Sequence, residues 1–172
     1  MEILFKFVII ILGVYLLAYL LNKIEDYYKN KSLIKLSFAA TLEELNLPIV
    51  TLMNNGQSFN FLIDTGASVS IIDSKALNAL EHTKLSKEGT SYGIDGNIIN
   101  SSYVKVDLFY KDVKFSEEFQ VLRMNAFDNI QKTNHISLVG ILGSSFLNEN
   151  KFTVNFEELM LVFNKNISNN KN

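Results

Sequence analysis

One segment constrains the fold of this chain more than any other, residues 59–73, which read FNFLIDTGASVSIID. An apolar run, Phe61–Ile63, ends on Asp64, and a second apolar run begins at Val69. The four residues between them include a glycine and are of kinds that form tight turns. Backbone N–H groups of such a turn can donate to the carboxylate and fix its position. The segment therefore predicts a positioned aspartate in a cleft, with Asp64 as the candidate catalytic carboxylate.

The chain before this segment begins with an apolar run, Ile3–Leu21, which is interrupted only by Lys6. As a helix with a rise of about 1.5 Å per residue, such a run roughly spans the hydrocarbon core of a bilayer. We expect a single-pass transmembrane anchor at residues 1–22, followed by a polar juxtamembrane spacer at residues 23–35. A cleaved signal peptide is the competing interpretation, disfavoured because no small-x-small cleavage pattern follows the run. Lysines lie on both sides of the run, so the side of the membrane on which the catalytic domain lies stays open.

Composition excludes several kinds of site. The chain of 172 residues has no cysteine, so disulfides, thiolate metal sites and a cysteine nucleophile are ruled out. Its two histidines, His82 and His135, are far apart in sequence, and neither a metal nor another cofactor is expected. A net charge of -2 gives no reason to expect nucleic acid as a partner.

The remainder of the chain consists mostly of short β-type runs separated by turn residues. Leu47–Met53 and Ser58–Ile63 flank an Asn-Gly turn, and Ile98–Tyr110 follows a glycine-containing turn; both are hairpin signals. We expect one domain at residues 36–165 and a disordered tail at residues 166–172, which is rich in Asn and Lys.

Three features of this domain resemble the retropepsin family, the single-domain aspartic peptidases of retroviruses and their cellular relatives. The first is the family's active-site loop, which corresponds here to Asp64, Thr65, Gly66, Ala67 and Ser68. The second is the hairpin where the family places its flap, which corresponds here to Tyr92, Gly93, Ile94, Asp95 and Gly96. The third is the family's second signature, which corresponds here to Ile141, Leu142 and Gly143.

The resemblance implies an all-β fold, a retropepsin-like half-barrel with one short helix at Ser144–Asn148, here preceded by the N-terminal transmembrane helix. It implies an aspartic endopeptidase in which two aspartates share a proton, activate a water and hydrolyse a peptide bond. The chain holds one Asp-Thr-Gly and no internal repeat. The second aspartate must then come from another copy of the chain, so a homodimer acting on a peptide or protein substrate is expected.

The sequence also departs from the family pattern and leaves alternatives open. Ser144 and Ser145 stand where retroviral enzymes have an arginine and many cellular relatives an acidic residue, which puts the details of assembly in question. One alternative is a catalytically silent domain of the same fold that binds peptides or only dimerises. Another is a phosphate loop of the kind found in actin-like ATPases, which the length of the chain argues against.

Overall fold

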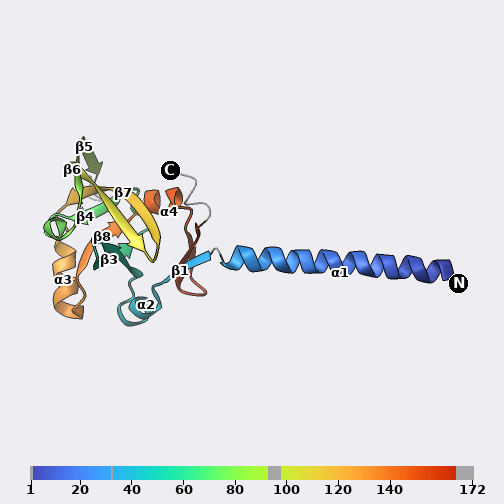
Figure 1. Cartoon of the computed structure of the whole chain (residues 1–172). Coiled ribbons are helices and arrows are strands. Elements are labelled where there is room, and N and C mark those ends of the chain that lie inside the picture. The colour runs from blue at the N-terminus through green and yellow to red at the C-terminus, as the bar shows by residue number, and fades with distance from the viewer. Residues whose placement is uncertain (1, 32, 93–97, 166–172) are drawn as a thin grey trace. The chain divides into compact units, whose positions relative to one another are not determined.

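The computed structural model describes residues 2–31, 33–92 and 98–165 of the chain (Figure 1). The chain divides into two compact units, Met1–Ile34 and Lys35–Asn172. A single helix, α1 (Glu2–Lys31), makes up most of the first unit. The strands are β1 (Leu33–Ser37), β2 (Ile49–Asn54), β3 (Gln57–Ile63), β4 (Ser70–Asp73), β5 (Thr83–Tyr92), β6 (Ile98–Tyr110), β7 (Val113–Leu122), β8 (Leu138–Leu142), β9 (Thr153–Asn155) and β10 (Met160–Asn164). The other helices are α2 (Ala39–Leu45), the 3-10 turn η1 (Leu77–Ala79), α3 (Asn125–Asn134) and α4 (Ser144–Glu149).

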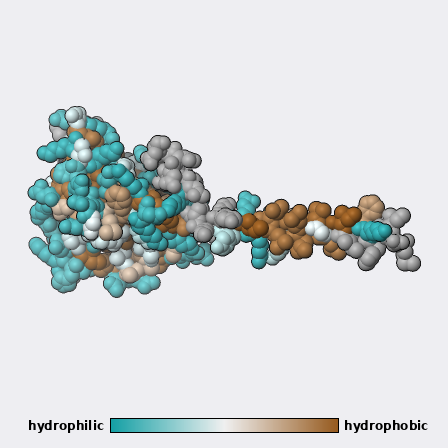
Figure 2. Space-filling model, viewed as in Figure 1, coloured by the Kyte–Doolittle hydropathy of each residue, from teal (hydrophilic) through white to brown (hydrophobic). Residues whose placement is uncertain are grey.

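The predicted transmembrane anchor is not supported by the structure. Figure 2 shows apolar side chains gathered along α1. A membrane span requires about 20 consecutive, predominantly apolar residues in one helix. Among the residues that the structure describes, no helix is long and apolar enough to cross a membrane. The prediction of an anchor at residues 1–22, and with it of a single-pass membrane localisation, is therefore wrong.

The predicted all-β fold class with one short helix is also wrong, because helices occupy several connections between strands. The structure is a mixed α/β, retropepsin-like sheet fold, in which α2, α3 and α4 lie in the second unit. The helix expected at Ser144–Asn148 is present as α4, whereas α2 and α3 were not predicted. In α3, only Phe127 is fully buried, so a mostly polar sequence becomes helical through one small contact face.

The main sheet has seven strands in the order β2-β3-β8-β4-β7-β6-β5 and is partly closed by a pairing of β2 with β6. Strand β8 lies between β3 and β4, parallel to β3 and antiparallel to β4. The two strands that flank the aspartate turn, β3 and β4, are therefore not neighbours. Strand β8, which carries most of the second signature, lies between them. A second sheet of three strands has the order β1-β10-β9.

The Asn-Gly turn between β2 and β3 fixes the register of the strand that delivers Asp64. Asn55 and Gly56 both have positive φ, 46° and 76°, as a two-residue hairpin turn requires. Asn54 pairs with Gln57, and the pairing continues to Ile49 opposite Leu62. The hairpin expected at this position is confirmed.

The core beneath the sheet is aromatic. The ring centroids of Phe115 and Phe146 are 5.8 Å apart, and those of Phe115 and Phe163 are 5.1 Å apart. Phe152 stacks on Phe146 at 5.3 Å and so joins the C-terminal segment to α4. Burial of aromatic side chains of this size gives each one an apolar contribution of about 2 kcal/mol or more.

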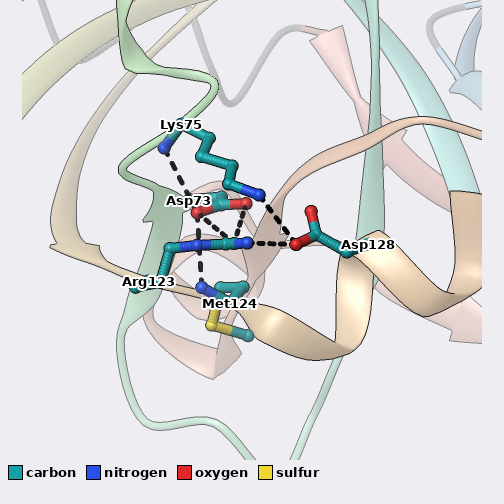
Figure 3. A network of polar contacts seen from close by, with 5 residues as sticks. All are labelled: Asp73, Lys75, Arg123, Met124 and Asp128. Atoms are coloured by element: carbon teal, nitrogen blue, oxygen red, sulfur yellow. Dashed lines mark hydrogen bonds and ion pairs between the residues drawn. The ribbon is translucent and has the colours of Figure 1, made fainter.

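A polar network joins the end of β4 to α3 (Figure 3). The side chain of Asp73 is only 5% exposed. Its carboxylate accepts two hydrogen bonds from Nη1 of Arg123, one to Oδ1 at 3.1 Å and one to Oδ2 at 2.9 Å. Arg123 also forms an ion pair with Asp128, which lies in the first turn of α3. Nζ of Lys75 lies 2.7 Å from Oδ2 of Asp128. The arginine therefore fixes the start of α3 against the strand that follows the aspartate turn.

Candidate active site

Strand β3 delivers Asp64 to the surface of the sheet. Alternation along β3 buries Phe59, Phe61 and Ile63, so the next residue points away from this face. Asp64 is half-buried, and its backbone N–H donates to the carbonyl of Leu142 at 3.1 Å. The aspartate is thus held at the edge of the core by the neighbouring strand β8.

The turn after Asp64 positions its carboxylate. The N–H of Gly66 donates to Oδ1 of Asp64 at 2.9 Å, and the N–H of Ala67 donates to the carbonyl of Asp64 at 3.2 Å. Thr65, Gly66 and Ser68 are exposed around it. A carboxylate with one oxygen engaged by a backbone donor keeps its orientation and leaves its other oxygen available for chemistry.

The second signature segment binds this loop directly. The backbone N–H and the hydroxyl of Ser144 both donate to the carbonyl of Ala67, at 2.8 Å and 3.0 Å. The N–H of Ser145 donates to the carbonyl of Ser68 at 3.3 Å. The two serines that depart from the family pattern therefore hold the loop through neutral hydrogen bonds. The structure brings together residues 64–68 and the segment Ile141–Gly143, which are far apart in sequence.

Gly143 allows this close approach. A Cβ at this position would lie 2.5 Å from the carbonyl oxygen of Val69 and 2.9 Å from that of Ala67. Both are backbone atoms of the segment that follows Asp64, and they cannot move away without shifting the loop. The glycine is therefore required by the contact between the two signature segments.

Substitution of Gly143 should reveal this contact. We expect Gly143→Ala to lower the free energy of unfolding by about 2 kcal/mol, as overpacking of a close contact does. Chemical denaturation measures the change. The matched control is Gly13→Ala, because a Cβ at Gly13 would meet nothing within 4 Å. The control should be as stable as the wild type or slightly more stable, because alanine is favoured over glycine within a helix. A Gly143→Ala variant as stable as the wild type would show that the loop moves aside without cost.

The expected flap is described only in part. Strands β5 and β6 form the predicted hairpin, and its last described pair is Tyr92 with Ile98. The candidate flap residues Gly93, Ile94, Asp95 and Gly96 lie outside the described residues. Within the described part of the chain, no group of three or more His, Asp or Glu side chains could hold a metal ion.

Sequence inspection missed one buried acidic residue next to the loop, Glu117 on β7. It is 4% exposed, and burial raises the pKa of its carboxyl from the ordinary 4.5 to about 7. Val113, Phe115 and Phe119 of the same strand are buried with it in strict alternation. A glutamate at a position where the alternation of the strand predicts a buried apolar residue was the signal that could have identified it.

The fold and the site together define a class of protein. A strand-borne aspartate in a glycine turn, held by a glycine-containing strand between the two flanking strands, has the organisation of the single-domain aspartic peptidases. Residues 50–146, more than half of the chain, match the family model described as aspartyl protease, and the chain belongs to this family. The resemblance to retropepsin-like peptidases inferred from the sequence is confirmed.

The similarity to individual proteins is more distant. One similar solved structure is the EIAV protease complexed with the inhibitor HBY-793, which is 20% identical with a TM-score of 0.47. That match covers 62% of this chain and 89% of the viral one. No curated protein matches the chain in sequence.

Proposed function

We propose that the protein is an aspartic endopeptidase that forms its active site between two copies of the chain. The observation that carries this proposal is the Asp64 carboxylate, which one backbone N–H fixes at 2.9 Å in an exposed loop. Membership of the aspartyl protease family supports the class of reaction. The catalytic role of Asp64 and the homodimer are parts of the proposal.

The dimer follows from the chemistry that the family performs. Peptide hydrolysis of this kind uses two carboxylates, and the chain has a single Asp-Thr-Gly. A twofold axis passing beside the loop would bring each Asp64 to face its counterpart, because an isologous interface pairs each surface with its own image. The exposure of Thr65 and Gly66 in one chain is consistent with a surface that a second copy covers.

In such a dimer, the two carboxylates would share one proton, since like charges so close cannot both be ionised cheaply. The ionised Asp64 would act as general base on a water bound between them. Its protonated counterpart would donate to the carbonyl oxygen of the scissile bond. The hydrogen bond from Gly66 would keep each carboxylate oriented without taking part in the proton transfer.

The substrate would be an extended peptide or an unfolded segment of a protein. The long antiparallel hairpin of β5 and β6 is the element that would cover it, with β-type main-chain pairing between peptide and hairpin. The candidate flap residues at its tip remain part of this proposal. A silent domain that binds peptides without cleaving them is the second candidate, and it has no chemical need for a fixed carboxylate.

A mixing experiment tests the dyad and the dimer together. Inactive Asp64→Asn chains are added in increasing excess to a fixed amount of wild-type chains, and peptide cleavage is measured. If subunits exchange and pair at random, a tenfold excess should lower the activity to about one tenth, because most wild-type chains then sit in mixed dimers. A titration of this form shows that both aspartates are needed.

The control for mixing is an excess of Asp112→Asn chains, since Asp112 is an exposed residue paired with Lys165 on the surface. These chains should add activity instead of removing it. Activity that stays constant as Asp64→Asn chains are added would mean that a single chain carries the whole site, and the dimer proposal would be wrong.

A further inference from the structure

The carboxyl of Glu117 is buried beside the active-site loop and belongs to no ion pair among those described. It lines a pocket of about 410 Å³ together with Val69, the residue after the active-site loop, and Ser145, two residues after Gly143. The hydroxyl of Ser145 lies 3.4 Å from Oε1 of Glu117, and the neighbouring hydroxyl of Ser70 is the group that most lowers the pKa of this carboxyl. Two serines from different segments thus converge on one buried acid.

Each serine is also bonded to one of the two signature segments, Ser70 to Gly143 and Ser145 to the loop that carries Asp64. The N–H of Gly143 donates to Oγ of Ser70 at 3.1 Å, within the buried interior. The N–H of Ser145 donates to the carbonyl of Ser68 at 3.3 Å. Each serine therefore links Glu117 to a backbone group of a signature segment, one by way of β4 and the other by way of α4.

We propose that Glu117 is a positioning residue for Asp64, which fixes the two signature segments through Ser70 and Ser145 and makes the order of the active-site loop depend on pH. This proposal rests on the proposed function, because Asp64 matters only if it performs the chemistry. Glu117 itself would touch neither substrate nor the reacting atoms.

Hydrogen-bond chemistry gives the direction of the effect. An ionised carboxylate accepts from both serine hydroxyls, and Ser70 then keeps its lone pairs for the N–H of Gly143. A protonated carboxyl makes only neutral hydrogen bonds with these hydroxyls, which are about half as strong as charge-assisted ones. The ionised form therefore holds the loop more firmly than the protonated form.

Burial, together with the neighbouring hydroxyls and charges, sets the pH at which this change occurs. Burial raises the pKa of Glu117 most, the hydrogen bonds from Ser70 and Ser145 lower it, and the negative charge of Glu149 raises it, for a pKa of about 7. The titratable groups that line the same pocket come from four elements: Glu118 on β7, Glu149 on α4, Lys87 on β5, and Tyr103 and Lys105 on β6. The transition thus falls near neutral pH.

The contribution of Glu117 to the free energy of unfolding changes with pH in the opposite direction to the order of the loop. Since the folded pKa of Glu117 lies above the ordinary value, folding favours its protonated form. The resulting stabilisation is complete below about pH 4.5 and is lost as the pH rises through about 7. The variant Glu117→Gln, which resembles the protonated form, should therefore be more stable than the wild type at pH 8, and the two should converge at low pH.

The test is an NMR titration of the backbone amides of Gly143 and Ser145 in the full chain. In the wild type, both should show a transition with a midpoint near pH 7, and in Glu117→Gln this transition should be absent. The matched control Glu118→Gln changes the next residue, which is exposed and paired with Lys87 at 3.1 Å, and should keep the transition. An unchanged transition in Glu117→Gln, or none in the wild type, overturns the proposal.

Two further variants keep the test decisive if Glu117→Gln does not fold. Glu149→Gln should move the midpoint to lower pH, because it removes a charge that raises the pKa of Glu117. Ser145→Ala should move it to higher pH, because it removes a hydrogen bond that lowers this pKa. Shifts in the opposite directions would assign the transition to another group.

Cleavage kinetics separate positioning from a purely structural role. As the pH rises through the transition, kcat of the wild type should rise about tenfold relative to that of Glu117→Gln, while KM changes little. The reason is that the Asp64 carboxylate is better aligned when Glu117 is ionised. The pH dependence of the dyad itself is common to both proteins and cancels in the ratio. Amides that titrate in a protein that cleaves no peptide would disprove the proposed function and leave the coupling of Glu117 to the loop intact.

Discussion

Asp64→Asn is expected to lower peptide cleavage by at least about 10³-fold, the range that removal of a general acid–base group spans. Asparagine can still accept the hydrogen bond from Gly66, so the turn should keep its shape. It cannot take a proton from water, and because both copies of the chain carry the change, the dimer has neither the base nor the acid of the dyad. The measurement is the initial rate of cleavage of a peptide mixture, with thermal unfolding to show that the variant is folded.

The control is Asp112→Asn, the same change at an exposed carboxylate paired with Lys165. It should leave the cleavage rate unchanged. Cleavage by Asp64→Asn at the wild-type rate would remove Asp64 from the mechanism. A wild-type protein that cleaves nothing and does not bind a statine-type transition-state analogue would instead support the silent domain.

The turn that follows Asp64 was predictable because the residues that form it are contiguous in sequence. The apolar strand, the aspartate and the glycine turn are contiguous, and the hydrogen bond from Gly66 to Asp64 spans two residues. The Asn-Gly turn at Asn55-Gly56 was predictable for the same reason, since two positive φ angles require such residues. The meeting of this loop with Gly143 is different, because it depends on the order of strands across the sheet. The resemblance to a family identified Ile141–Gly143 as a signature but did not predict this contact.

What could not be predicted depends on tertiary contacts. Helix α3 is short and mostly polar with one fully buried residue, Phe127, and its position depends on the ion pair of Arg123 with Asp128. The pKa of Glu117 depends on burial by elements that are distant in sequence. The departures at Ser144 and Ser145 were noticed, but the sequence does not reveal that Ala67 and Ser68 accept their hydrogen bonds.

The network in Figure 3 leads to the largest expected effect on stability. Arg123→Met should lower the free energy of unfolding by about 3 kcal/mol, because it leaves the carboxylate of Asp73 buried without its counterion. The remaining donors to Asp73 in the network are the N–H groups of Lys75 and Met124, both at 3.3 Å and too long to replace a guanidinium. The value lies at the low end for a broken buried pair, since the Arg123 side chain is 30% exposed.

Lys75→Met is the matched control, since Lys75 also pairs with Asp128 but its side chain is 59% exposed. A pair of this kind contributes little to stability, so urea denaturation should place this variant close to the wild type. The contrast also bears on the site. Because Asp73 ends the strand that follows the aspartate turn, the loss of Arg123 should loosen β4 and reduce cleavage even where the protein remains folded. If the two methionine variants were equally stable, Asp73 would gain nothing from its arginine, and β4 would be held by its strand pairings with β7 and β8 alone.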